Sequence, residues 1–230
     1  MKRYLGKLYA EAGTLNQENI RRMLLLDENA HFLDLGCDDG SLTLEMAKEI
    51  GTQNISGVEI VDSRILLAEK KGVKVRKFDL NREFDFETNS IDVIHANQVI
   101  EHLYDSDMFI SEIYRVLKKG GYAVISTENA SSWCNIFASI MGWQIFSLTN
   151  FSSKKQGIGN PLSLHGGNAL ELESWNHVRI YNIRGLKEYF EAFGFVVEKI
   201  KGAGYFPLPA FFGNLDKIHS HFITFKIRKF

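Results

Sequence analysis

An apolar run that stops at two closely spaced glycines constrains this chain more than any other feature. The run Phe32-Leu33-Asp34-Leu35 is followed by Gly36-Cys37-Asp38-Asp39-Gly40 and then by an amphipathic stretch, Ser41 to Ile50. This order predicts a strand, a tight loop and the first turns of a helix. Such a loop can present backbone N–H groups and the positive end of a helix dipole to an anionic or polar ligand. We therefore expect a nucleotide-like cofactor near residue 36.

The glycine spacing alone does not identify the ligand. Gly36 and Gly40 are spaced as GxxxG, whereas the dinucleotide fingerprint is GxGxxG, and an ordinary strand-to-helix turn would also explain the loop. The next predicted strand, Ile55 to Ile60, contains Glu59 near its end, 23 positions after Gly36. A carboxylate about 20 positions beyond the loop is placed to accept from both hydroxyls of a ribose.

Further strands and helices alternate along the chain. Strands are predicted at residues 73–81, 91–96 and 122–126, with a helix at 108–117 and a turn at Gly120-Gly121 before the last of these strands. This alternation indicates right-handed βαβ units in a parallel sheet.

Five motifs occur in a fixed order. They are Asp34 to Gly40, Glu59 at the end of the second strand, Phe78-Asp79-Leu80, Ile91 to Ile94 with Glu101-His102-Leu103 behind it, and Arg115 to Gly121. Together they resemble the class I S-adenosylmethionine-dependent methyltransferase family, over residues 28–130 and more loosely over 185–230.

The resemblance implies an α/β fold with a doubly wound, mostly parallel, Rossmann-like sheet of seven strands. The implied strand order is 3-2-1-4-5-7-6, with the last strand antiparallel. Its closing part would be a helix at 185–193, a strand at 195–201 and a final strand at 222–229. Residues 1–230 would form a single methyltransferase domain, with a helical cover at 1–27 and a substrate-side insertion at 127–184.

The resemblance also implies S-adenosyl-L-methionine as cofactor, with its methionine part at the glycine loop. Gly36, Gly40 and the backbone of Cys37 would pass close to it. Asp34 would hold its ammonium group directly or through water, and Asn97 would lie where the methyl group leaves.

The nucleoside part would lie at the ends of the second and third strands. Glu59 would accept from both ribose hydroxyls, a geometry that suits a carboxylate. Asp79 and the N–H of Leu80 would bind the adenine edge, while Ile60 would pack on the ring face.

One position departs from the family's pattern, because Asp38 stands where the family usually has a third glycine. If this position requires a positive φ, aspartate tolerates it better than most residues, at a cost of about 1 kcal/mol. Its carboxylate would lie unfavourably beside the cofactor's own carboxylate unless it faces the ammonium group.

Methyl transfer to a hydroxyl requires the loss of a proton, and histidine is the usual base at neutral pH. The candidate catalytic residues are His102, His165 and His177, and each could instead be a packing or capping residue. The insertion at 127–184 is placed to build the acceptor pocket.

Two apolar segments suggest what the acceptor is like. Ile136 to Phe146 and the aromatic segment Tyr205 to Phe212 could together form a mouth for a lipid-linked or otherwise apolar acceptor. A buried loop or a contact in a homodimer would also explain the second segment. The insertion also resembles that of methyltransferases acting on small or glycan-related molecules. The predicted reaction is methyl transfer to a small-molecule acceptor, for which a glycan- or lipid-related kind is the expectation.

Composition limits the classes of partner. With 27 basic and 28 acidic residues the net charge is −1, which argues against a broad nucleic-acid surface. Cys37 and Cys134 belong to no CxxC or Cys/His cluster, so we predict no metal site. No apolar run reaches about 18 residues, so we expect no transmembrane segment and a cytoplasmic protein.

Two other functions stay open. A nicotinamide-dependent reductase would share the fold and the acidic residue at position 59, but the chain lacks the GxGxxG spacing and a Tyr-x-x-x-Lys motif. A non-catalytic binding or regulatory module could also be built on a methyltransferase fold.

Overall fold

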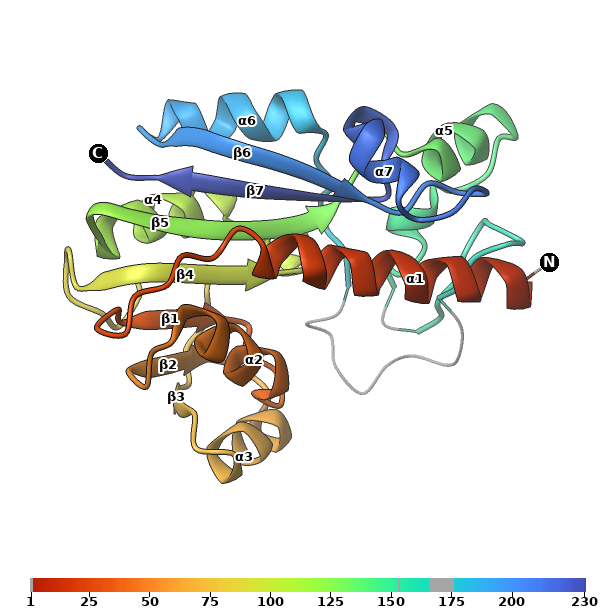
Figure 1. Ribbon diagram of the computed structural model, residues 1–230. Helices are drawn as coiled ribbons and strands as arrows, with labels where there is room; N and C mark the ends of the chain where they lie inside the picture. The colour runs from red at the N-terminus through yellow and green to blue at the C-terminus, as the bar shows by residue number, and fades with distance from the viewer. Residues whose placement is uncertain (1, 153, 166–175) are drawn as a thin grey trace.

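A seven-stranded sheet forms the centre of the computed structural model, which describes residues 2–152, 154–165 and 176–230 (Figure 1). The strands are β1 (Phe32–Leu35), β2 (Ile55–Val58), β3 (Lys74–Arg76), β4 (Ile91–Asn97), β5 (Leu117–Glu128), β6 (Val196–Ala203) and β7 (Phe222–Arg228). Their order is β3-β2-β1-β4-β5-β7-β6, and only β7 runs antiparallel to its neighbours. The predicted sheet order and the antiparallel last strand are confirmed.

Helices cover both faces of the sheet. Successive side chains of a strand point to opposite faces, so the apolar side chains of these strands must be buried on both. Phe32 of β1 packs with Met46 and Ile50 of α2 (Ser41–Ile50) and with the end of α1 (Lys2–Arg21). Leu33 and Leu35 point to the opposite face, into the larger core cluster formed with α4 (Ser106–Val116) and α6 (Ile183–Ala192). One further helix, α3 (Asp62–Lys70), follows β2.

The helix α1 crosses the face of the sheet over β5, β7 and β6 and reaches the carboxyl ends of the strands (Figure 1). Two buried asparagines fix it there. The Asn16 side chain bonds to Asn97 of β4, and Asn19 donates to the carbonyl oxygen of Gly202 in β6. The predicted helical segment at the N-terminus is thus a single helix.

Several predicted boundaries are wrong. The strand β3 is only three residues long, so Asp79 lies in the loop beyond it. Gly120 and Gly121 lie inside β5 rather than in a turn before it. Gly120 has a φ of 82°, and the pairing of β4 with β5 shifts register here, so the glycines form an irregularity within the strand.

The segment after β5 lies at the carboxyl end of the sheet. It contains α5 (Trp133–Ile140) and the 3₁₀ turn η2 (Phe146–Leu148), whereas residues 166–175 of the predicted insertion lie outside the described residues. The short helix α7 (Phe212–Leu215), in the connection from β6 to β7, is near α5 in Figure 1. Among the described helices, none combines the length and apolar character needed to cross a bilayer.

Candidate active site

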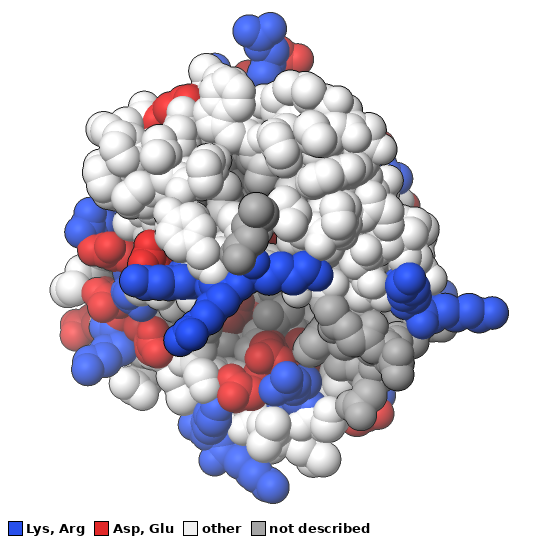
Figure 2. Space-filling model, turned by 90° about the vertical axis from the view of Figure 1, so that its right-hand side faces the viewer, with Lys and Arg blue, Asp and Glu red and all other residues white. Residues whose placement is uncertain are grey.

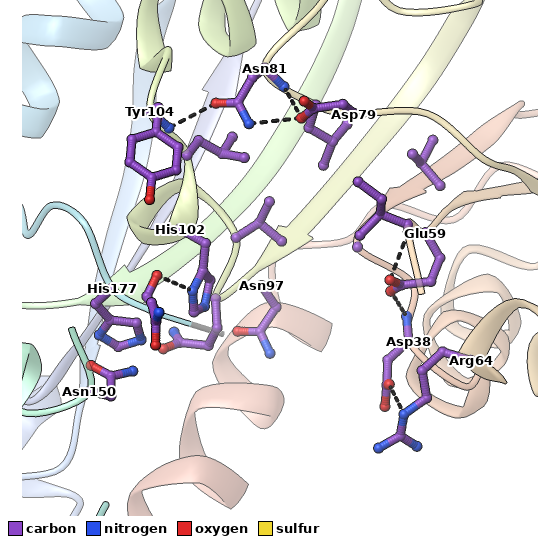
Figure 3. Close-up of a pocket in the computed structure, with 18 of the residues that line it drawn as sticks. Asp38, Glu59, Arg64, Asp79, Asn81, Asn97, His102, Tyr104, Asn150 and His177 are labelled. Carbon is purple, nitrogen blue, oxygen red and sulfur yellow. Dashed lines mark hydrogen bonds and ion pairs between the residues drawn. The ribbon is translucent and has the colours of Figure 1, made fainter. Parts of the chain in front are cut away.

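A cavity of about 970 Å³ opens at the carboxyl ends of β1, β2 and β4 (Figure 3). Nine of the residues predicted for the cofactor and for catalysis line it: Gly36, Glu59, Ile60, Asp79, Leu80, Asn97, His102, His165 and His177. Ligand sites in open α/β sheets form at this edge, where the strand order reverses.

Three predicted cofactor residues do not line this cavity. Asp34 is 2% exposed, accepts from Thr43 Oγ1 at 2.6 Å and pairs with His95 Nδ1 at 2.7 Å. The Cys37 thiol is turned into a small cluster with Ala68, and Gly40 is the N-cap residue immediately before α2. Asp34 thus lies behind the loop, and its predicted role would need an intervening water.

The glycine loop forms part of the cavity wall and lies close against Val99, which follows β4. Gly36 has a φ of 76°, and a Cβ there would lie 2.7 Å from Val99 Cγ2, so only glycine fits. The N–H groups of Gly36 and Cys37 both donate to the carbonyl oxygen of Val58, each at 2.9 Å. The neighbouring strand thus already uses these two N–H groups, so any loop N–H groups that bind a ligand must come from other positions.

Asp38 has a φ of 46°, so the position does require the left-handed conformation. Its carboxylate pairs with Arg64 Nε at 3.0 Å, and its N–H donates to Glu59 Oε2 at 3.1 Å (Figure 3). The Arg64 guanidinium offsets the negative charge that Asp38 introduces beside the cofactor site.

Backbone groups fix the Glu59 side chain. Besides the Asp38 N–H, the N–H groups of Ile60 and Val61 donate to Glu59 Oε1 at 2.8 Å and 3.0 Å. A carboxylate has about four acceptor sites, so the carboxylate keeps capacity for a ribose hydroxyl while its position is set.

Asp79 belongs to a small network that the sequence analysis missed. Its Oδ1 accepts from the backbone N–H of Asn81 at 2.9 Å and from Asn81 Nδ2 at 2.7 Å, while Asn81 Oδ1 accepts from the backbone N–H of Tyr104 at 2.8 Å. The spacing Asp79-Leu80-Asn81 is typical of an Asx turn and could have revealed this network. Asn81 thereby ties the adenine-side loop to the segment after β4.

The three predicted histidines meet at the other end of the cavity, although they come from distant parts of the chain. His102 lies in η1 (Ile100–His102), and its ring centroid is 4.7 Å from that of His177, which is 5.9 Å from that of His165. Burial lowers the pKa of His102 to about 4 and also lowers the pKa of His165. Both rings are therefore neutral at pH 7.

A buried carboxylate beside these rings was also missed. Glu101 is fully buried, and within the described part of the chain neither of its carboxylate oxygens has a hydrogen-bonding partner. Burial raises its pKa to about 7. In the sequence, Glu101-His102 served only as part of the family resemblance, and nothing in it predicted that the glutamate side chain would be buried.

A second cavity, of about 350 Å³, adjoins the first at Leu164 and His165. Its wall is mostly apolar and combines Gly6 of α1 with Phe146 and Phe206. These two phenylalanines belong to the two apolar segments that were predicted to meet, Ile136 to Phe146 and Tyr205 to Phe212.

The residues present fit S-adenosylmethionine. One cavity of about 970 Å³ contains Glu59 and Asp79 at the nucleoside end and Gly36 of the glycine loop in its wall, a size that is typical of cofactor sites. Asn97 and the histidines lie beyond the loop, at the end from which a methyl group would be transferred (Figure 3).

The comparisons with known proteins agree with this geometry. A family model described as a methyltransferase domain matches residues 6–200. Over 125 residues the chain is 30% identical to a ubiquinone biosynthesis O-methyltransferase of Pelagibacter ubique, covering 49% of this chain and 48% of that protein. The mitochondrial ubiquinone biosynthesis O-methyltransferase of Rattus norvegicus is 28% identical over 122 residues, covering 49% and 35%. The chain thus spans less than half the length of these relatives.

Solved structures share the fold. A methyltransferase from Thermotoga maritima gives a TM-score of 0.63 at 16% identity, covering 100% of this chain and 97% of its own. A cyclase named SpnF gives 0.61 at 17% identity, covering 93% and 80%, so the fold by itself does not fix the reaction. The family model, which spans most of the chain, decides the assignment: the chain belongs to the class I S-adenosylmethionine-dependent methyltransferases.

Proposed function

We propose that this protein transfers the methyl group of S-adenosylmethionine to a hydroxyl group of a small, partly apolar molecule. The observation that carries the proposal is the shared cavity, in which Glu59 and Asp79 stand at one end and His102, His165 and His177 at the other. Relatives named for ubiquinone, demethylmenaquinone and sterol methylation support an apolar acceptor.

Methyl transfer is a direct displacement, so the protein acts mainly by aligning three atoms and excluding water. The acceptor oxygen forms a bond to the methyl carbon as the carbon–sulfur bond breaks, and the electron pair of that bond stays on sulfur. The hydroxyl proton must pass to a base.

His165 is placed to take this proton. Thr149 Oγ1 donates to the carbonyl oxygen of Phe146 at 3.0 Å and lies 2.7 Å from His165 Nδ1. Thr149 Oγ1 also lies 2.9 Å from Ser163 Oγ. With the Thr149 proton directed to the Phe146 carbonyl, His165 Nδ1 donates to Thr149 and Nε2 carries the lone pair. A lowered pKa keeps the ring unprotonated at neutral pH, as a base must be.

The second cavity supports an acceptor with an apolar portion. It meets the first at His165, so a molecule that presents its hydroxyl there can extend its apolar part between Phe146 and Phe206. Outside this cavity, the end of the molecule around α5 and α7 carries few charges (Figure 2). Ile140, Leu215 and Ile218 on that surface are 77%, 75% and 61% exposed.

The test combines binding with transfer. Calorimetry with S-adenosylmethionine and with NADH should show binding of the first alone. Labelled methyl groups should then appear on hydroxyl acceptors with apolar tails, such as prenylated phenols, and less on their tail-free analogues. Cofactor binding without transfer to any hydroxyl acceptor would favour a non-catalytic module, and binding of NADH would favour a reductase.

A further inference from the structure

The rings of His102 and His177 share one orientation. His102 Nδ1 lies 3.1 Å from the carbonyl oxygen of Asn176, and His177 Nδ1 lies 2.6 Å from that of Ser147. A carbonyl oxygen only accepts, so both Nδ1 atoms carry a proton, and the two Nε2 atoms are left as the ring nitrogens that can bind a cation. Metal-binding histidines are held in this way, with one ring nitrogen donating to a backbone carbonyl.

The Glu101 carboxylate lies beside these rings. It is 0% exposed, and neither oxygen has a partner at full hydrogen-bond geometry among the residues that the structure describes, although the Thr127 hydroxyl is close enough to act against the rise in the pKa of Glu101. A buried carboxylate without donors is costly, and such groups are normally paired or coordinate a cation.

These three side chains converge from two separate parts of the chain. Glu101 and His102 belong to η1, directly after β4, and His177 follows the insertion. One ligand atom from each lies within 4.8 Å of the other two. The two parts are held together by backbone hydrogen bonds, because the N–H groups of Val178 and Arg179 donate to the carbonyl oxygen of Glu101.

We propose that Glu101, His102 and His177 bind one divalent transition-metal cation, of which zinc is the simplest candidate. Two imidazoles and one carboxylate form a common ligand set for catalytic zinc and for non-haem iron, and such sites keep at least one position open. His102 and His177 line the main cavity, so the open position would face the acceptor.

The cation's role in the reaction rests on the proposed function, whereas its binding does not. A hydroxyl oxygen bound at the open position would have a lowered pKa and would lose its proton to His165 more readily. His165 is outside the ligand set and stays available as the base. The proposed site departs from the sequence-based prediction of no metal site, which rested on the absence of a CxxC or Cys/His motif, because these ligands are brought together only by the fold.

Metal binding is tested on the whole chain after treatment with a chelator. Cobalt(II) absorption and calorimetry with zinc should both show one equivalent per chain, bound without S-adenosylmethionine. His177→Asn and Glu101→Gln each remove a direct ligand and should weaken binding by more than the roughly 10- to 100-fold that the loss of an outer-shell partner costs. His219→Asn is the matched control, because His219 pairs with Asp216 at 2.8 Å on the surface and should not affect the affinity.

Saturation below one equivalent, or an affinity unchanged in both His177→Asn and Glu101→Gln, would overturn the metal site. Binding of S-adenosylmethionine, measured for each variant, shows whether that variant is folded. If only one of the two variants is folded, that variant alone tests the metal site. Full methyl transfer by chelated, metal-free protein would refute the cation's role but leave the proposed function standing. A bound metal with no transfer to any acceptor would refute the proposed function but leave the metal site standing.

Discussion

Glu59 has two kinds of contact that compete for one carboxylate. Backbone N–H groups from Asp38, Ile60 and Val61 hold it at the end of β2, and the cofactor ribose would use the capacity that remains. The carboxylate is thus positioned before any ligand arrives, which lowers the entropy cost of binding. Asp38 contributes only its backbone, since its own carboxylate pairs with Arg64.

Replacing Glu59 by alanine should therefore weaken the binding of S-adenosylmethionine by about 1–3 kcal/mol, through lost charge-assisted hydrogen bonds. Calorimetry measures the change. Asp38→Asn is the control, because it keeps the backbone N–H and removes only the charge that pairs with Arg64, so its affinity should change little. An unchanged affinity in Glu59→Ala would remove Glu59 from the ribose site.

The neutral state of His102 makes stability depend on pH. Its folded pKa of about 4 lies below the ordinary value of 6.5, so the unfolded chain binds more protons and stability falls as pH drops below 6.5. Between pH 7.5 and 5.5 the loss from this residue is about 1 kcal/mol. The raised pKa of Glu101 acts in the opposite direction, so the wild-type curve alone is not diagnostic.

His102→Asn isolates the effect, because an asparagine amide can still donate to the Asn176 carbonyl without titrating. In metal-free protein, urea unfolding at the two pH values should show that the variant loses about 1 kcal/mol less than the wild type over this interval. Parallel losses in both proteins would mean that His102 is not held neutral by burial.

At the scale of elements, α1 is part of the site as well as a cover. Asn16 donates through Nδ2 to Asn97 Oδ1 at 3.1 Å, and its Oδ1 accepts from Ser126 Oγ at 3.0 Å and from Thr224 Oγ1 at 2.8 Å. One side chain thus links α1 to β4, β5 and β7. Because Asn97 lines the cavity, the helix sets the position of a residue that is predicted to lie where the methyl group leaves.

Asn16→Ala should destabilise the fold by about 1–3 kcal/mol, because it leaves buried hydroxyls unsatisfied, and should also weaken cofactor binding or slow transfer. Asn19→Ala removes a comparable buried contact, to the Gly202 carbonyl at 3.1 Å, but touches no residue of the cavity. Asn19→Ala should lose as much stability in urea unfolding as Asn16→Ala does, and its affinity for the cofactor should be unchanged. Equal effects on affinity in both variants would contradict the link through Asn97.

How far the sequence predicts these elements depends on whether a contact is local. The loop at Gly36, the strand β1 and the helix α2 follow from a short apolar pattern bounded by glycines, and their bounds are as expected. Contacts made across the fold, such as that of Asn16 to Thr224, leave no trace in local periodicity. Glu101 illustrates the same limit, since only the packed structure shows that its carboxylate is enclosed beside His177.

Across the whole molecule, the two cavities lie next to each other and would give the acceptor a path from the cofactor site toward the weakly charged end of the protein. They share the wall residues Leu164 and His165, so the position proposed for proton transfer lies where the two cavities meet. The smaller cavity lies between α1 and the connection from β6 to β7, where Figure 1 shows the start of α1 near α5 and α7. Acceptor size should therefore be controlled by residues far from the cofactor.

Gly6 offers a direct test of this path. It lines the smaller cavity, and a Cβ there would meet nothing within 4 Å, so Gly6→Leu places a side chain in the space without a clash at the backbone. The affinity for S-adenosylmethionine should stay constant while the KM for an acceptor with a long apolar tail rises about 10-fold, equivalent to about 1.4 kcal/mol of lost burial.

Gly13→Leu is the matched control, since Gly13 is also in α1, has equal room for a Cβ and does not line the cavity. Both variants gain helix propensity alike, so a difference in KM between them reports the cavity alone. If Gly6→Leu and Gly13→Leu methylate long-tailed and tail-free acceptors equally well, the apolar part of the acceptor does not occupy this path.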